Sequence, residues 1–262
     1  MKFRAAMATV AAVPIALGLA ACGNDKPEAT GYKPSPSAST PVATTAAPVK
    51  PAPVAHLNRV TFVPAMNAAL TKQKSWRILG TMTANGQTVL TMKGIQTADP
   101  VAMSMEMTGA AFQGKTAKIV VVKKAAYMSI PGMTPAGKYV KIAAGDAGEF
   151  GELLSGSDPT KIFKSFDSSV ATVKFVRTET IGGQTLDRYA VTVNTAKALA
   201  AQGKKVPAGV PKTLTYSMWM DKSHRIGRMS FDLSGVSMVM NLTDYNKPVS
   251  ITAPPASKIV SR

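Results

Sequence analysis

Three stretches near the end of the chain alternate between apolar and polar residues, and this pattern limits the fold more than any other feature. The apolar positions are Leu214, Tyr216, Met218 and Met220, then Met229, Phe231 and Leu233, then Val236, Met238, Met240 and Leu242. Because successive side chains of a β-strand point to opposite faces of a sheet, a period of two predicts strands with one buried face. The chain is therefore expected to build a sheet that is apolar on one side.

Earlier segments extend this sheet. Asn85-Gly86 and Gly182-Gly183 are typical of two-residue hairpin turns, in which both central residues take positive φ. Residues 101–108 alternate as clearly as the later stretches. Strands are expected at residues 76–84, 87–97, 101–108, 116–123, 125–130, 138–142, 173–181, 184–193, 213–221, 225–233 and 236–243.

Three helices are expected among these strands. One covers residues 62–74, with Thr61 as its cap and Pro64 in its first turn. A second runs from Asp158-Pro159 to Ser168, and a third is capped by Asn194 and ends at Gly203. The elements predict an α+β domain with a single curved antiparallel sheet of about eleven strands and a few covering helices.

The first residues have the composition of an export signal. Lys2 and Arg4 precede an uncharged stretch that runs from Ala5 to Ala21, as in a secretory signal peptide. The stretch is too short for a membrane span and contains Pro14 and Gly18. Residues 1–21 are expected to be removed, which leaves a chain without a spanning helix.

The single cysteine of the chain follows this signal directly. Leu19-Ala20-Ala21-Cys22 before Gly23 resembles the lipobox of bacterial lipoproteins, in which signal peptidase II cleaves before the cysteine and its thiol carries diacylglycerol. The alternative is a free cysteine in an ordinary signal region. The resemblance implies a lipid attached to Cys22 and a protein anchored to the outer face of the cell membrane.

Residues 22–56 are expected to form the lipidated N-terminus and a tether, and residues 57–262 the folded domain. Proline, alanine, serine and threonine dominate the tether, which shows no apolar periodicity. The thirty-four residues from Gly23 to His56 reach about 100 Å if fully extended as polyproline II, or about 30 Å as a flexible coil. The domain can thus stand well clear of the bilayer.

Short phrases of the domain are similar to those of actinobacterial LppX/LprG-type lipoproteins, which belong to the wider LolA/LolB superfamily. The phrases are Ala126-Tyr127-Met128-Ser129, Lys138-Tyr139-Val140-Lys141, Asp158-Pro159-Thr160-Lys161, Leu186-Asp187-Arg188-Tyr189-Ala190-Val191-Thr192-Val193, Met218-Trp219-Met220-Asp221 and Tyr245-Asn246-Lys247-Pro248-Val249. The resemblance covers about residues 57–256. It implies an unclosed, LolA-like half-barrel whose concave face holds the acyl chains of a lipid or glycolipid.

The methionine content fits this role. Thirteen of the fifteen methionines lie after the signal, all except Met1 and Met7, and such flexible, polarizable side chains accept apolar partners of several shapes. Ordinary core packing is the alternative, but the sheet is larger than three short helices can cover. The residues expected to line a lipid cavity are Met82, Leu90, Met92, Met103, Met105, Met107, Ile119, Val121, Tyr189, Val191, Met218, Met220, Met229, Phe231, Met238 and Met240.

The chain is strongly basic. It carries 31 Lys and Arg against 14 Asp and Glu, a formal net charge of +17, with no run of more than two lysines. Anionic head groups or wall polymers at an external surface are expected partners, and simple solubility is the alternative. Nucleic-acid binding is not expected, because no recognised binding module is present.

Catalysis has little support in the sequence. One cysteine and two histidines exclude an internal disulfide and a metal site built on these ligands. His56 lies in the tether. His224 directly follows Ser223 in a turn, and adjacent residues do not take the nucleophile–base geometry that a Ser-His-Asp site with Asp232 would need. We expect no enzyme activity, no metal and no cofactor.

Two classes of function remain open at this stage. The first is a monomeric carrier that moves lipid between membrane and envelope, and the second is a LolA-like envelope sensor that binds a partner protein. A wall-associated structural protein with a collapsed cavity is a third alternative. The glycine-rich loop at residues 145–157 is expected to be either a lid or a docking site.

Overall fold

The computed structural model describes residues 55–123, 125–143, 166–201, 205–206 and 209–260. The signal peptide, Cys22, most of the tether and the loop at residues 145–157 therefore lie outside the described residues. The elements are α1 (Phe62–Leu70), β1 (Ser75–Ala84), β2 (Gln87–Ala98), β3 (Val101–Gly109), η1 (Ala110–Phe112), β4 (Thr116–Val122), β5 (Ala125–Ser129), β6 (Tyr139–Ala143), β7 (Val170–Ile181), β8 (Gln184–Asn194), α4 (Thr195–Ala200), β9 (Thr213–Met220), β10 (Ile226–Leu233), β11 (Val236–Thr243), η2 (Ala256–Lys258) and β12 (Ile259–Val260).

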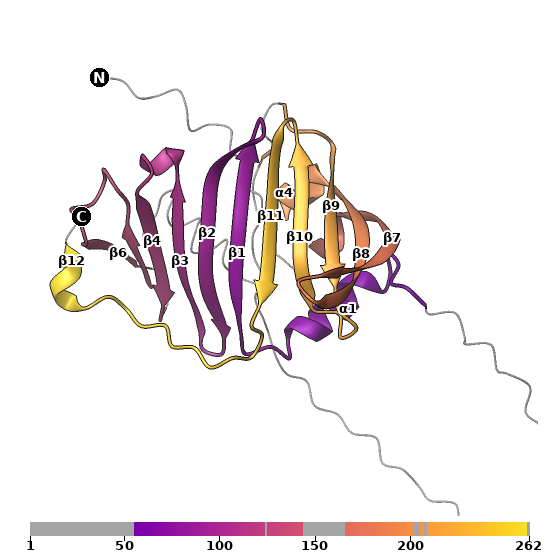
Figure 1. Ribbon diagram of the computed structural model, residues 1–262, viewed down its shortest axis with the longest axis horizontal. Helices are drawn as coiled ribbons and strands as arrows, with labels where there is room; N and C mark the ends of the chain where they lie inside the picture. The colour runs from indigo at the N-terminus through magenta and orange to yellow at the C-terminus, as the bar shows by residue number, and fades with distance from the viewer. Residues whose placement is uncertain (1–54, 124, 144–165, 202–204, 207–208, 261–262) are drawn as a thin grey trace, which may run out of the picture. The chain divides into compact units, whose positions relative to one another are not determined.

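All described strands belong to one open sheet. Their order is β12-β6-β5-β4-β3-β2-β1-β11-β10-β9-β8-β7, so the first and last hairpins of the domain meet where β1 pairs with β11. Figure 1 shows the sheet curving, with α1 and α4 at the end of the sheet that holds β8 to β11. The predicted fold class, a single unclosed sheet with few helices, is confirmed.

The strand prediction differs from the structure at the C-terminus. Eleven strands were expected and their positions agree to within three residues, but β12 is a twelfth. It pairs in parallel with β6, whereas every other pair is antiparallel. A strand of two residues is too short to show any periodicity, which is why the sequence pattern did not indicate it.

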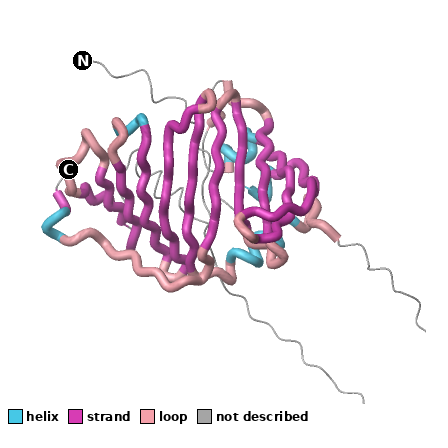
Figure 2. Tube along the Cα trace, viewed as in Figure 1, coloured by secondary structure: helices cyan, strands magenta, loops and turns pink. Residues whose placement is uncertain are grey.

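The two predicted hairpin turns form as expected. Asn85 and Gly86 have φ values of 49° and 77°, and Gly182 and Gly183 have 57° and 79°. These positive values match the twist of the flanking strands. Figure 2 shows how short these connections are compared with the strands they join.

The first helix is shorter than predicted and is capped differently. α1 ends at Leu70, and Thr61 makes no side-chain capping bond. Instead, Asn58 Oδ1 accepts hydrogen bonds from the backbone N–H groups of Val60 and Thr61, at 2.9 and 3.2 Å. The helix buries Phe62, Val63, Met66 and Leu70 against the sheet.

The other helix predictions have mixed outcomes. Asn194 does cap α4, because its side chain accepts the N–H of Lys197 at 2.9 Å, but this helix ends at Ala200 and contributes no buried residue. Of the helix predicted over residues 158–168, only residues 166–168 are described, and they are helical. None of the described helices is long and apolar enough to cross a membrane.

The chain after β11 forms a C-terminal strap, residues 244–258, that runs along one end of the strands to β12 (Figure 1). Ile251 and Ile259 pack against a small apolar cluster made of Ala102, Val122, Ala125 and Tyr127. Lys138 Nζ also donates to the carbonyl oxygen of Ser257, at 2.8 Å. The strap thereby covers apolar side chains near the β6 edge of the sheet.

Close backbone approach in the β2–β3 hairpin predicts a site that is sensitive to substitution. A Cβ at Gly109 would collide with the Val89 carbonyl oxygen and lie 3.0 Å from Leu90 Cα. We expect Gly109→Ala to lower the free energy of unfolding by about 2 kcal/mol in urea titrations. Gly80→Ala should cost clearly less, because its Cβ would meet the flexible end of Met92. Equal losses would contradict this account.

Candidate functional site

One face of the sheet, called the inner face from here on, carries a continuous apolar cluster. All sixteen residues predicted to line a cavity belong to this cluster or pack against it. Ten are buried, and six are partly exposed, namely Met82, Leu90, Met103, Met107, Val121 and Met229. The pairing of the strands thus brings the predicted residues together on one surface.

Strand register explains why the methionines lie side by side. One row of paired residues crosses the sheet from β8 to β3. In order, the row contains Tyr189, Met218, Met229, Met240, Gly80, Met92 and Met107. Because opposed residues in an antiparallel pair lie on the same face, five methionines from five strands form a single band.

Two glycines make room for methionines of the inner face, Gly80 for Met92 of the band and Gly94 for Met105. A Cβ at Gly80 would come within 2.6 Å of Met92 Cε, and a Cβ at Gly94 within 2.9 Å of Met105 Sδ. The methionine side chains therefore lie flat over the backbone of neighbouring strands. Sequence analysis missed both glycines, although each stands at an inner-face position of its strand and marks a close approach.

Aromatic side chains fill the inner face near β8 and β9. Tyr189 packs edge-to-face against Phe62 of α1 and Phe175 of β7, with ring centroids 5.4 and 5.8 Å apart. Tyr216 packs against Phe231 at 5.8 Å and Phe166 at 6.3 Å. Such pairs add to the stability gained from burial, so this part of the face is a fixed core.

The inner face is less completely covered along β2 to β4. Leu90, Met103, Met107 and Val121 all lie on this part of the face and keep partial solvent exposure. No aromatic pair occurs among the described residues of these three strands. Flexible side chains with free surface are what a site for apolar ligands of variable shape requires.

Some inner-face residues escaped the sequence prediction. Trp76, Ile78 and Leu242 are buried in the same cluster. Trp76, Ile78, Gly80 and Met82 are every second residue of β1 and share one face, so the period of two was sufficient to find Trp76 and Ile78. The packing of α1 against the inner face could not be predicted in this way, because the sequence pattern of a helix does not indicate which strands it will pack against.

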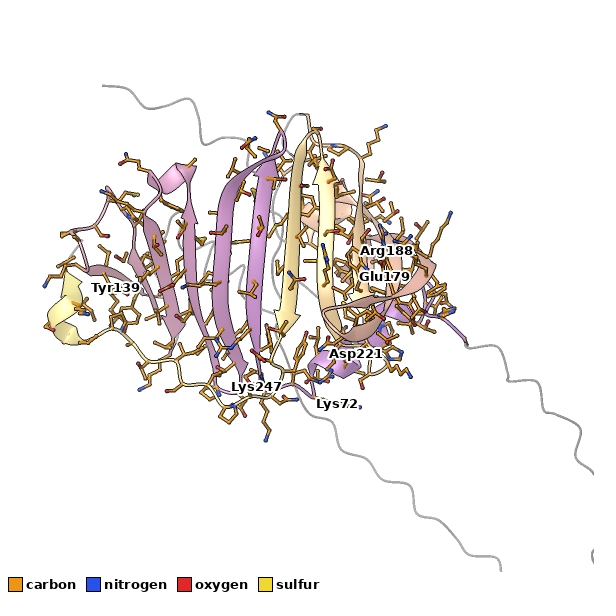
Figure 3. All side chains as sticks on the ribbon, viewed as in Figure 1. Lys72, Tyr139, Glu179, Arg188, Asp221 and Lys247 are labelled. Atoms are coloured by element: carbon orange, nitrogen blue, oxygen red, sulfur yellow. The ribbon has the colours of Figure 1, made fainter. Side chains whose placement is uncertain are left out.

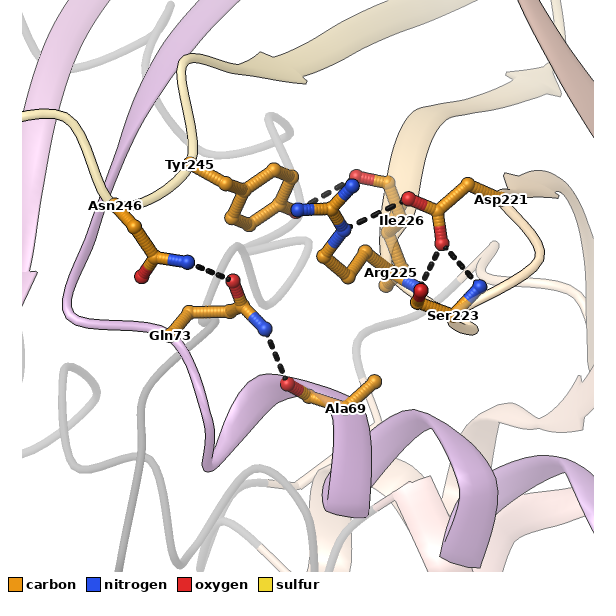
Figure 4. A network of polar contacts seen from close by, with 8 residues as sticks. All are labelled: Ala69, Gln73, Asp221, Ser223, Arg225, Ile226, Tyr245 and Asn246. Carbon is orange, nitrogen blue, oxygen red and sulfur yellow. Dashed lines mark hydrogen bonds and ion pairs between the residues drawn. The ribbon is translucent and has the colours of Figure 1, made fainter.

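A polar network joins the end of α1 to the chain after β11 (Figure 4). Asn246 Nδ2 donates to Gln73 Oε1 at 2.8 Å, and Gln73 Nε2 donates to the carbonyl oxygen of Ala69 at 2.7 Å. Asn246 Oδ1 also accepts the N–H of Lys74 at 2.7 Å. These bonds hold α1 at one end of the inner face.

Beside this network, the Asp221 carboxylate organises the turn that contains His224. It accepts the N–H groups of Ser223 and Arg225 at 2.8 and 2.9 Å, and Arg225 Nε at 2.7 Å. The Arg225 guanidinium lies 5.3 Å from the Tyr245 ring centroid. Burial raises the pKa of Tyr245, whose hydroxyl donates to the Ile226 carbonyl oxygen at 2.7 Å. The polar groups of this turn are thus engaged in holding its shape.

Metal ligands do not come together in the described part of the chain: no three His, Cys, Asp or Glu side chains there form a group that could hold an ion.

Comparison with solved structures identifies the fold. The chain superimposes on the lipoprotein LppX of Mycobacterium tuberculosis with a TM-score of 0.53 and 15% identity, over 74% of this chain and 98% of LppX. LprF of Mycobacterium bovis gives a TM-score of 0.52 and 15% identity, over 75% and 96%. The expected LppX/LprG-type fold is confirmed. No protein-family profile and no curated protein sequence matches the chain.

Tyr216 predicts a specific alkaline sensitivity. Burial on the inner face raises its pKa to about 12, whereas an unfolded tyrosine ionises near about 10. Its stabilising contribution is therefore complete below about pH 10 and is lost as pH rises toward about 12. In urea titrations between pH 8 and pH 11, the free energy of unfolding of Tyr216→Phe should fall less steeply with pH than that of the wild type. An unchanged pH slope would contradict the assignment.

Proposed function

We propose that this LppX/LprG-type fold binds the acyl chains of a lipid or glycolipid against its inner face. The protein would carry this lipid between the cell membrane and the rest of the envelope. The observation that supports the proposal is the partly exposed apolar surface along β2 to β4, lined by Leu90, Met103, Met107 and Val121. These residues belong to the set expected to line the cavity.

Binding of this kind requires no reactive side chain. Each square ångström of apolar surface removed from water contributes about 25 cal/mol, so an acyl chain that buries a few hundred square ångströms is held by several kcal/mol. Flexible methionines can adjust to chains of different length or branching. The same property lets the cargo leave when another apolar environment, such as a membrane, competes for it.

The proposed anchor explains how the domain reaches its cargo. Acylation at Cys22 would hold the protein to the outer face of the membrane, and the tether of residues 23–56 would let the domain move about 30 Å or more from it. One of the two similar proteins is described as a lipoprotein. Its likeness in fold supports the proposal of the same attachment in this chain.

Lipid binding is tested on a secreted form in which a cleavable secretory signal replaces residues 1–22, with native mass spectrometry and lipid extraction as the readouts. Met103→Glu places a carboxylate on the inner face and should reduce bound lipid about tenfold, because burying an unpaired charge is costly. Ser104→Glu is the matched control, since the next residue of β3 faces the opposite side. It should retain the lipid.

Two results would contradict the lipid-binding proposal. One is a wild-type protein that is folded and carries no lipid, which would favour the sensor alternative. The other is an equal loss of lipid in both variants, which would show that the inner face is not the site. Circular dichroism of each variant separates loss of lipid from loss of fold.

The anchor is tested separately in the protein's own host. Cys22→Ala should abolish the mass added by acylation and leave residues 1–21 attached, because signal peptidase II cleaves before the acylated cysteine; mass spectrometry of the membrane fraction reads both changes. Thr30→Ala, a substitution within the tether, should change neither property. A Cys22→Ala protein that still carries the acyl mass, or that is still cleaved before residue 22, would overturn the lipobox assignment.

A further inference from the structure

The opposite side of the sheet, called the outer face, carries an ordered stack of two arginines on a tryptophan. Arg188, Trp219 and Arg228 are paired neighbours on β8, β9 and β10. The Arg188 and Arg228 guanidinium carbons lie 5.0 and 5.2 Å from the Trp219 ring. Stacking on an indole holds a guanidinium in place without neutralising its charge.

Neighbouring groups fix this stack. Trp219 Nε1 donates to Glu179 Oε1 at 2.8 Å, and Arg188 Nη2 donates to Ser217 Oγ at 2.9 Å. Figure 3 labels Arg188 and Glu179, which lie close together on the face turned toward the viewer. Arg228 has no ion pair or hydrogen bond to another described side chain, and its enclosed Nε has no acceptor. No acidic side chain in the described part of the chain therefore neutralises its charge.

The row of paired residues continues from this stack into a hollow. Arg228 is opposite Asn241, which is opposite Leu79, which is in turn opposite Lys93. These last three residues help line a hollow of about 460 Å³ whose wall also contains Thr81, Thr91, Thr108 and Glu106. With strands about 4.8 Å apart, the row from Arg188 to Lys93 spans about 24 Å.

The row and the residues beside it, namely Arg177 and Glu179 on β7, Glu106 on β3 and Lys118 on β4, have a net positive charge even after their ion pairs are counted. Five cations, Arg177, Arg188, Arg228, Lys93 and Lys118, stand against Glu179 and Glu106, which leaves +3. Lys118 and Lys93 both bond to Glu106, at 2.9 Å each, and these hydrogen bonds lower the pKa of its carboxyl. Of the net +3, the arginine end carries +2 and the lysine end +1.

We propose that this row on the outer face binds a segment of an acidic polysaccharide. Guanidinium groups bind the carboxylates of such a polymer, often with two parallel hydrogen bonds, while the threonine hydroxyls and Asn241 can bond to its sugar hydroxyls. The 24 Å span suits several linked sugar rings. The lipid-binding proposal concerns the other face of the sheet, so neither proposal depends on the other.

The composition of the row favours a polysaccharide over a membrane surface. Proteins that bind lipid head groups at an interface usually also insert apolar side chains. In the described row, Leu79 is the one exposed apolar side chain, and it lies in the hollow among polar groups. The surface offers charge and hydroxyl groups for recognition but little that enters a bilayer.

The test uses the full mature protein in neutral detergent micelles and a galacturonate oligomer of about twelve sugars as the probe. Isothermal titration at low salt should show binding that disappears with the methyl-esterified, uncharged oligomer. Arg188→Gln/Arg228→Gln should weaken binding at least about tenfold. Trp219 fluorescence provides a local readout, because the second tryptophan, Trp76, is buried on the inner face.

A control with the same loss of charge separates this site from general attraction to a basic protein. Lys72→Gln/Lys222→Gln removes two exposed charges that lie outside the row and should change affinity less than about twofold. Equal weakening in both double variants, or no binding by the wild type, would overturn the proposal. Glycerol phosphate that binds in place of the oligomer would overturn it in favour of a phospholipid head group.

Discussion

The structure depends on the hydrogen-bonded ladder that joins the twelve described strands into one open sheet. Because side chains alternate between faces, the register of each pair decides which residues become neighbours, and a shift of one residue would exchange the two faces. The ladder places five methionines in a single band with Gly80. The neighbouring residue on each strand points to the outer face, and there the same ladder forms the row that contains Trp219 and Arg228.

The two faces consequently have different chemistry on a shared backbone. The inner face is apolar, with a fixed aromatic part around Tyr189 and Tyr216 and a less covered part lined by flexible methionines. The outer face carries stacked arginines, ion pairs and threonine hydroxyls. The two proposed ligands, an apolar chain and an ionic polymer, would therefore bind opposite faces of the sheet and would not compete.

Segments that follow the strands hold the open sheet in shape. Asn246 bonds to Gln73 and thereby fixes the end of α1 beside the inner face. The C-terminal strap continues from the same point and ends in β12, which pairs with β6 near one edge. Edges of an open sheet expose unpaired backbone groups, so a short added strand also reduces the capacity of this edge to pair with other chains.

The sequence by itself determined the positions of eleven strands, two hairpin turns and sixteen of the apolar residues on the inner face. Period-two alternation and residues such as Asn85-Gly86 act locally, so each segment could be read alone. Tertiary structure alone decided the order of the strands, the end of α1 at Leu70, the twelfth strand and the stack of Arg188 and Arg228 on Trp219. These features join residues that are distant in the chain, and a pattern within one segment carries no information about which strand will lie beside it.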